Sequence, residues 1–171
     1  LCLWLIEHKL SEAEFTTCGG FRSKGRGSKH DCSKPFADIL VDKQLCYYHE
    51  ARHYKYWHIT EANQTFFSNH AEYAQCPFQG GMNQLWRNQV LGLSIEQDER
   101  QPYKNTTFSV VKHPHNTPLD KSLAEYQQLI DNNSSFFVFT SKDICEAAAK
   151  LNDPILDAWI TWYQELYALQ G

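Results

Sequence analysis

The chain opens with Leu1-Cys2-Leu3-Trp4-Leu5-Ile6-Glu7-His8-Lys9, an unbroken apolar run that ends in Glu-x-Lys. Such a run is typical of a β-strand buried on both faces of a sheet. Residues two apart on a strand point to the same side, so Glu7 and Lys9 are expected side by side at its end. The carboxylate can hold a hard divalent cation, and the ammonium can orient water or balance phosphate charge. Glu-x-Lys also arises by chance, and a solvated strand end is the simpler interpretation of these nine residues alone.

Length and composition predict one globular domain. The net charge of -4 means that any nucleic-acid surface must be a local patch. No apolar run approaches the length of a membrane span, and the apolar start lacks a basic leader, which favours a cytoplasmic protein without a membrane partner. The chain begins in mid-strand without Met, so we expect upstream protein to be missing.

Strand patterns alternate with helical patterns after the first strand, which predicts an α/β domain. Strands are predicted at 107–112 and 135–140. Helices are predicted at 33–45, 46–57, 82–93, 119–130, 142–151 and 154–169.

A basic stretch occupies residues 21–30, in which Arg22, Lys24, Arg26 and Lys29 are separated by Gly and Ser. It is either a solvated flexible loop or a mobile loop that closes on the phosphates of a nucleic acid.

The six cysteines fall into two groups. Cys2 and Cys145 lie inside apolar elements and are interpreted as small core residues. The other four lie beside loops or element boundaries and include no Cys-x-x-Cys pair. They could bind Zn²⁺ or an iron–sulfur cluster, or be unrelated reduced thiols, whereas disulfides are less expected without a secretory context. These four are Cys18, Cys32, Cys46 and Cys76.

His49-Glu50-Ala51-Arg52-His53 matches the His-Glu-x-x-His pattern of zinc peptidases. On a helix the two histidines would lie one turn apart and could share a metal, with the glutamate as base. The charged Arg52, the tyrosine-rich flanks and the lack of a readable third ligand all favour an exposed helix instead.

The apolar strand into Ile6-Glu7-His8-Lys9, the following Ser11-Glu12 and the helix Asn83-Gln84-Leu85-Trp86-Arg87-Asn88 resemble bacterial members of the PD-(D/E)XK nuclease superfamily. The later order of strand, helix, strand and helices is also similar. The resemblance implies a restriction-endonuclease-like fold, with a mixed sheet flanked by helices. One domain would span 1–171, with a cysteine-containing insertion at about 16–80.

The resemblance also implies roles for particular residues. Glu7 would be the metal-binding carboxylate, with the backbone carbonyl of His8 as a further ligand, and Lys9 would be the catalytic lysine. Gln84 and Arg87 would face the site or the DNA phosphates.

Two departures from the superfamily pattern stand out. No Asp precedes Glu7, since the superfamily's Asp strand would lie upstream, and we therefore expect these residues alone to be inactive or nearly so. The insertion is also larger than a plain nuclease core needs. Some relatives carry a cysteine-bound iron–sulfur cluster, which the four loop cysteines could also hold, although their spacing differs. A second placement of the site, Asp38 with Glu50-Ala51-Arg52, lacks an apolar strand before Glu50 and ranks below the first.

The prediction is therefore a Mg²⁺-dependent DNA endonuclease serving DNA defence or repair. Its alternatives are a nuclease-fold DNA- or protein-binding module that has lost catalysis, and the zinc peptidase. Oligomeric state, including a homodimer, and the DNA sequence cut stay open. The catalytic set is Glu7, Lys9 and Gln84, and the DNA-binding set is Arg22, Lys24, Arg26, Lys29 and Arg87. The metal-binding set is Glu7, His8, Cys18, Cys32, Cys46 and Cys76.

Overall fold

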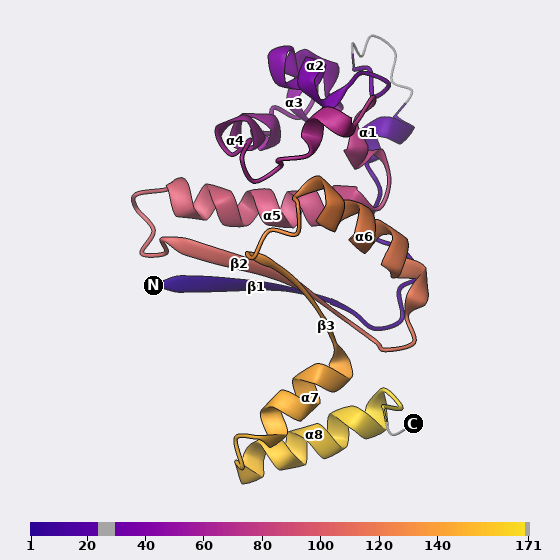
Figure 1. The fold of residues 1–171 in the computed structure, drawn as a ribbon, viewed down its shortest axis with the longest axis vertical. Coiled ribbons are helices and arrows are strands. Elements are labelled where there is room, and N and C mark those ends of the chain that lie inside the picture. The colour runs from indigo at the N-terminus through magenta and orange to yellow at the C-terminus, as the bar shows by residue number, and fades with distance from the viewer. Residues whose placement is uncertain (24–29, 170–171) are drawn as a thin grey trace.

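A small parallel sheet forms the centre of the molecule in the computed structural model (Figure 1). The structure describes residues 1–23 and 30–169, and within them the sheet has three strands. Their order is β1 (Cys2–Lys9), β2 (Asn105–Lys112) and β3 (Phe136–Thr140), all parallel. With helices packed around this sheet, the predicted α/β class is confirmed.

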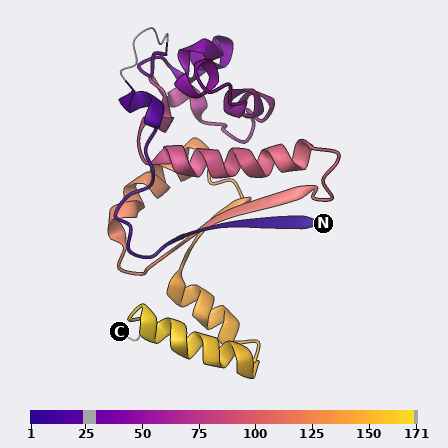
Figure 2. The ribbon, with the colours of Figure 1, turned by 180° about the vertical axis from the view of Figure 1, so that it is seen from behind.

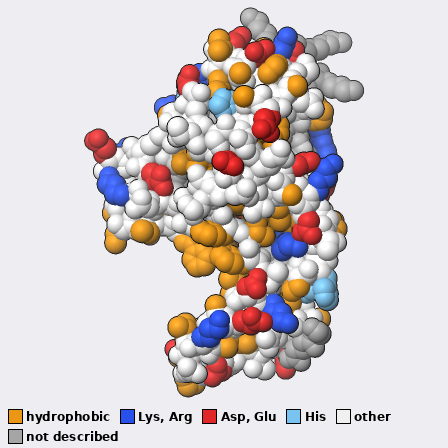
Figure 3. Space-filling view, viewed as in Figure 1, with side chains coloured by type: hydrophobic (Ala, Val, Ile, Leu, Met, Phe, Trp, Pro, Cys, Tyr) orange, Lys and Arg blue, Asp and Glu red, His pale blue; other side chains and the backbone are white. Residues whose placement is uncertain are grey.

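The prediction that β1 is buried on both faces is wrong. Trp4 and Ile6 are 51% and 53% exposed, whereas Leu5, on the other side of the strand, packs against the core. Among the described residues β1 is the edge strand, so the buried central strand is β2. Figure 3 shows apolar side chains gathered below the sheet, on the side turned toward the C-terminal helices.

Two helices cover the other face of the sheet (Figures 1 and 2). The longer, α5 (Met82–Gln97), begins where predicted and runs four residues further. It buries Leu85, Trp86, Val90 and Leu93. The second, α6 (Asp120–Leu129), connects β2 to β3, as a parallel pair requires.

The described residues between β1 and α5 form a helical cap that lies on the far side of α5 from the sheet (Figure 1). Trp57 and Phe78 join the cap to α5, and the Phe78 ring stacks on Trp86 at 4.2 Å between centroids. The helices of the cap are α1 (Gly19–Arg22), α2 (Phe36–Val41), α3 (Tyr47–Glu50) and α4 (Tyr56–Ala62). Short 3₁₀ turns occur at η1 (Lys43–Leu45), η2 (His70–Glu72) and η3 (Pro77–Gln79).

The predicted continuous helix over 46–57 is wrong. It is divided into α3 and α4, because His53 between them adopts a left-handed backbone conformation with φ 56°. A residue with positive φ cannot continue a right-handed helix.

The C-terminal helices α7 (Ser141–Ala149) and α8 (Pro154–Leu166) pack on each other away from the main core (Figure 2). Cys145 lies in their small core with Ile160 and Tyr163, as predicted for a core cysteine. Cys2 is exposed, so the same prediction for Cys2 is wrong, because β1 is an edge strand. The 3₁₀ turn η4 (Thr117–Leu119) precedes α6. No helix among the described residues is long and apolar enough to cross a membrane.

Gly92 sets how closely α5 approaches the sheet, which leads to a test by substitution. A Cβ at this position would lie 2.8 Å from Thr106 Oγ1 and 3.4 Å from Leu5 Cδ1. The Thr106 hydroxyl donates to Glu96 and is not free to turn aside without losing that bond. We therefore expect Gly92→Val to lower the free energy of unfolding by about 1–3 kcal/mol, measured by urea denaturation.

The matched control is Gly80→Ala, because a Cβ on Gly80 meets no atom within 4 Å. Equal urea midpoints for the Gly92→Val variant and the wild type would show that α5 does not depend on this close approach.

Candidate active site at the end of β1

Glu7 and Lys9 lie side by side near the carboxyl end of β1. The Lys9 Nζ is 3.3 Å from Glu7 Oε1, and the two side chains are 7% and 22% exposed. An ammonium this deeply buried needs an acidic partner, since an unpaired buried charge is costly. The two-residue spacing on the strand thus places an ion pair on the α5 side of the sheet.

The Glu7 carboxylate is also held from α5. Gln84 Nε2 donates to Glu7 Oε1 at 2.6 Å, and Asn88 Nδ2 donates to Oε2 at 3.0 Å. The Thr16 backbone N–H donates to the other end of the Gln84 amide at 2.9 Å, which fixes the amide's orientation. Both carboxylate oxygens are therefore oriented by the protein.

Sequence reasoning named Gln84 for this site and missed the role of Asn88. The two residues are four apart on a helix and so share one face, which was the available signal.

Glu12 is a second carboxylate beside Lys9 that sequence reasoning did not assign to the site. Its Oε1 lies 3.7 Å from Lys9 Nζ, and the side chain is half exposed. Backbone N–H groups, above all its own, lower the pKa of Glu12, with a smaller contribution from Lys9. The Phe15 ring packs 5.6 Å from the same ammonium. Lys9 thus sits between two carboxylates and over an aromatic ring.

The remaining residues of the predicted site lie apart from this centre. The Arg87 guanidinium carbon lies 6.0 and 5.9 Å from the ring centroids of Tyr48 and Tyr56 in the cap, and within the described part of the chain Glu7 is bonded from α5 by Gln84 and Asn88 instead. Arg22 is exposed on α1. The His8 side chain bonds to the Tyr163 hydroxyl at 2.7 Å, which leaves only its backbone carbonyl for the predicted ligand role. Three predicted DNA contacts, Lys24, Arg26 and Lys29, lie outside the described residues.

The geometry required by the zinc-peptidase alternative is absent. α3 ends at Glu50, so His49 and His53 are not carried on one helix, and the His49 ring packs on His58 instead. The described part of the chain contains no group of three or more His, Cys, Asp or Glu side chains arranged to hold an ion. The second placement, at Asp38 and Glu50, falls on α2 and α3 rather than on a strand.

The four loop cysteines converge in the cap. The Cys76 N–H donates to the Cys32 carbonyl at 3.2 Å. Gln79 links Cys18 to Cys32, because its backbone carbonyl accepts from the Cys18 N–H and its side-chain amide donates to the Cys32 carbonyl. Cys18, Cys46 and Cys76 are buried, and Cys32 is partly buried. Burial, followed by the charges of Cys18 and Cys46, raises the pKa of Cys32 to about 12. The four thiols are therefore neighbours, although they come from four separate segments.

Residues 41–167, more than half of the chain, match a family model described as the PD-(D/E)XK nuclease superfamily. The chain therefore belongs to this superfamily, whose members are usually nucleases and typically use divalent metals. The matched region contains α5 with Gln84 and Asn88, whereas Glu7 and Lys9 precede it. No curated protein and no solved structure matches the chain.

The buried thiols lead to a prediction about reactivity. Burial raises the pKa of Cys32, Cys46 and Cys76, so at pH 8 these groups stay protonated, and only the thiolate attacks an alkylating agent. In protein treated with a chelator, we expect iodoacetamide to label the exposed Cys2 first, with the other thiols labelled only on unfolding or at higher pH. Mass spectrometry of the labelled peptides measures this order. Labelling of Cys32 as fast as Cys2 would contradict the buried arrangement.

Proposed function

We propose that this protein hydrolyses phosphodiester bonds in DNA with Mg²⁺, and that Glu7 and Lys9 are its reaction centre. The observation that carries the proposal is the oriented Glu7 carboxylate beside the buried Lys9 ammonium, in a chain of the nuclease superfamily. DNA defence or repair is the setting that we propose for this activity.

The residues at the site fit a magnesium ion. Glu7 Oε1 already contacts both Gln84 and Lys9, whereas Oε2 accepts one N–H, from Asn88, and retains a lone pair for a further partner. Mg²⁺ is usually bound through one or two carboxylates, with waters and substrate phosphates completing the shell. Glu7 would hold the ion, and Glu12, which also pairs with Lys9, is a further carboxylate beside the site. When bound, Mg²⁺ supplies positive charge that polarises the phosphate and favours ionisation of water.

The protein side chains supply orientation and a fixed charge. Gln84 and Asn88 hold the Glu7 carboxylate in place before substrate arrives, so little reorganisation is needed during reaction. Lys9 can donate an N–H to the attacking water or to a phosphate oxygen as negative charge develops there. Its two carboxylate neighbours and Phe15 restrict where the ammonium can lie.

The predicted basic stretch supplies the proposed contacts to the DNA backbone. Arg22, Lys24, Arg26 and Lys29 would neutralise phosphates without reading bases. Such a local patch is needed because the chain as a whole is acidic.

A binding module without catalysis is the second candidate. It is favoured by the absence of a ready-made three-ligand set in the described residues. Such a module would bind DNA equally well with or without Mg²⁺ and would not cut it.

Substitution of the two central residues tests the proposal. We expect Glu7→Gln and Lys9→Met each to reduce Mg²⁺-dependent cleavage by roughly 100-fold or more, because each removes a charge that acts on the phosphate. The measurement is the rate of cleavage of single-stranded and duplex DNA on gels, with EDTA as the metal-free control.

Lys121→Met is the matched control, since Lys121 is exposed on α6 and outside the site. Thermal unfolding of each variant separates lost catalysis from lost folding. All variants are made in the full-length protein. Wild-type cleavage rates in both folded variants would exclude this reaction centre, and no cleavage by the full-length wild-type protein with Mg²⁺ would favour the binding module.

We also propose that Cys18, Cys32, Cys46 and Cys76 hold a metal centre that fastens the cap. A zinc ion bonded to all four would need sulfurs about 3.8 Å apart, given Zn–S bonds of about 2.3 Å in a tetrahedron. Among the described residues no three His, Cys, Asp or Glu side chains lie close enough together to bind one ion. The four cysteines are nevertheless neighbours in the cap. A [4Fe–4S] cluster binds its four thiolates on four separate irons, so its sulfurs can lie further apart, which favours such a cluster over one zinc ion.

Metal analysis and an absorption spectrum of anaerobically purified protein test this centre. We expect bound iron with a broad visible band, and the loss of both in Cys32→Ser but not in the control Cys2→Ser. One equivalent of zinc without colour would overturn the cluster, and no bound metal would overturn the centre altogether.

A further inference from the structure

A cavity of about 480 Å³ lies between the cap and α5, apart from the Glu7 site. Its chemistry is aromatic and cationic, and in the described part of the chain no acidic side chain lines it. The cavity is large enough for a small ligand, since such sites commonly measure about 300–1,000 Å³. Its lining is Gly19, Ser23, Tyr47, Tyr48, Arg52, Tyr54 and Arg87.

The tyrosines offer flat faces that are held in place. Tyr48 and Tyr54 lie almost parallel, 5.9 Å apart with 29° between their planes. The Gly19 N–H donates to the Tyr48 hydroxyl at 3.2 Å and fixes that ring. Tyr54 is 43% exposed, so part of its ring is open to a ligand. Exposed, fixed rings of this kind form stacking platforms for nucleic-acid bases.

The two arginines have unused hydrogen-bonding capacity. Arg87 contacts the Tyr48 and Tyr56 rings, but its Nε is buried and has no hydrogen-bond partner. Neither Arg87 nor Arg52 has a carboxylate within ion-pair distance among the residues that the structure describes. A buried N–H without a partner is costly, and a guanidinium is suited to a phosphate, which would relieve that cost.

The cavity and the proposed reaction centre both use residues of α5. Arg87 follows Gln84 by three residues on α5, which is about 4.5 Å along a helix axis. It directly precedes Asn88, the other α5 residue that bonds to Glu7. A strand that presents one phosphate to Glu7 and Lys9 therefore passes within about one helical turn of Arg87.

We infer that this cavity binds one unpaired nucleotide of a nucleic-acid strand, with the base against Tyr54 and Tyr48 and the phosphate at Arg87 and Arg52. A base in a duplex is stacked on both sides and paired, so it cannot reach these rings without leaving the helix. The cavity thus selects a single-stranded segment. Its position beside the scissile phosphate rests on the proposed function, whereas nucleotide binding itself does not.

The test measures binding separately from cleavage. A short fluorescein-labelled deoxyoligonucleotide is titrated with the protein in EDTA, where Mg²⁺-dependent cleavage is blocked, and its anisotropy is recorded. We expect Tyr54→Ala to weaken single-strand binding by at least about fivefold, since stacking of one base contributes about 1–3 kcal/mol. Arg52→Ala should weaken binding and make it less sensitive to salt.

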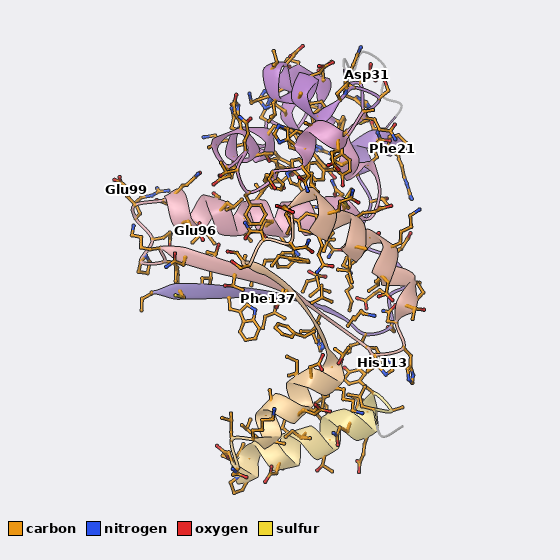
Figure 4. All side chains as sticks on the ribbon, viewed as in Figure 1. Phe21, Asp31, Glu96, Glu99, His113 and Phe137 are labelled. Carbon is orange, nitrogen blue, oxygen red and sulfur yellow. The ribbon has the colours of Figure 1, made fainter. Side chains whose placement is uncertain are left out.

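Matched controls are Tyr103→Ala and Arg100→Ala. Both residues lie outside the cavity, in the turn after α5, where Figure 4 labels the neighbouring Glu99. Their binding should equal that of the wild type, and thermal unfolding confirms that each variant is folded. The same oligonucleotide as RNA shows which sugar the cavity accepts, and the duplex form should bind independently of Tyr54.

The outcomes separate this inference from the proposed nuclease. Unchanged binding by folded Tyr54→Ala and Arg52→Ala, or equal losses with duplex and single strands, overturns the nucleotide site. Tyr54-dependent single-strand binding supports it even if the wild type cuts no DNA, a result that would remove only the nuclease proposal.

Discussion

The hydrogen bonds that the Glu7 carboxylate accepts join the central sheet to α5, the helix that covers it. Glu7 on β1 receives two amide N–H groups from α5 and lies against the Lys9 ammonium. These polar groups are largely removed from water, so each depends on the others for a partner. The position of α5 is in turn set by the close approach at Gly92 and by the aromatic stack that attaches the cap. Any displacement of α5 would therefore reach the carboxylate directly.

The cap contributes more than cover for α5. It gathers four cysteines from separate segments, and it holds the tyrosines and Arg52 that face Arg87 across a cavity. Because most of its helices are one or two turns long, the cap is held together by buried side chains rather than by helix propensity. The proposed metal centre and the proposed nucleotide site thus depend on the same packing.

The sequence predicts the local features of the site better than its surroundings. The strand period places Glu7 beside Lys9, and the apolar pattern predicts where α5 begins. The burial of β1 was predicted wrongly because an apolar run cannot reveal whether a neighbouring strand exists. The helix through His53 failed because one left-handed residue interrupts a pattern that is otherwise compatible with a helix. The bond from Asn88 to Glu7 and the gathering of the cysteines depend on tertiary contacts between segments far apart in the chain. Glu12 is only three residues from Lys9, but its place depends on how the chain turns after β1.

The parallel pairing of β1 with β2 has a consequence for the order of folding. Trp4 on β1 donates to Ser109 on β2, a contact between residues 105 positions apart. The first strand must therefore wait while the ends of this long loop are brought together, which is entropically costly and slow compared with local helix formation. The helical cap and α5 can form before β1 docks. Glu7 and Lys9 would then enter the molecule last, so a chain with most of its helical content could still lack an assembled reaction centre.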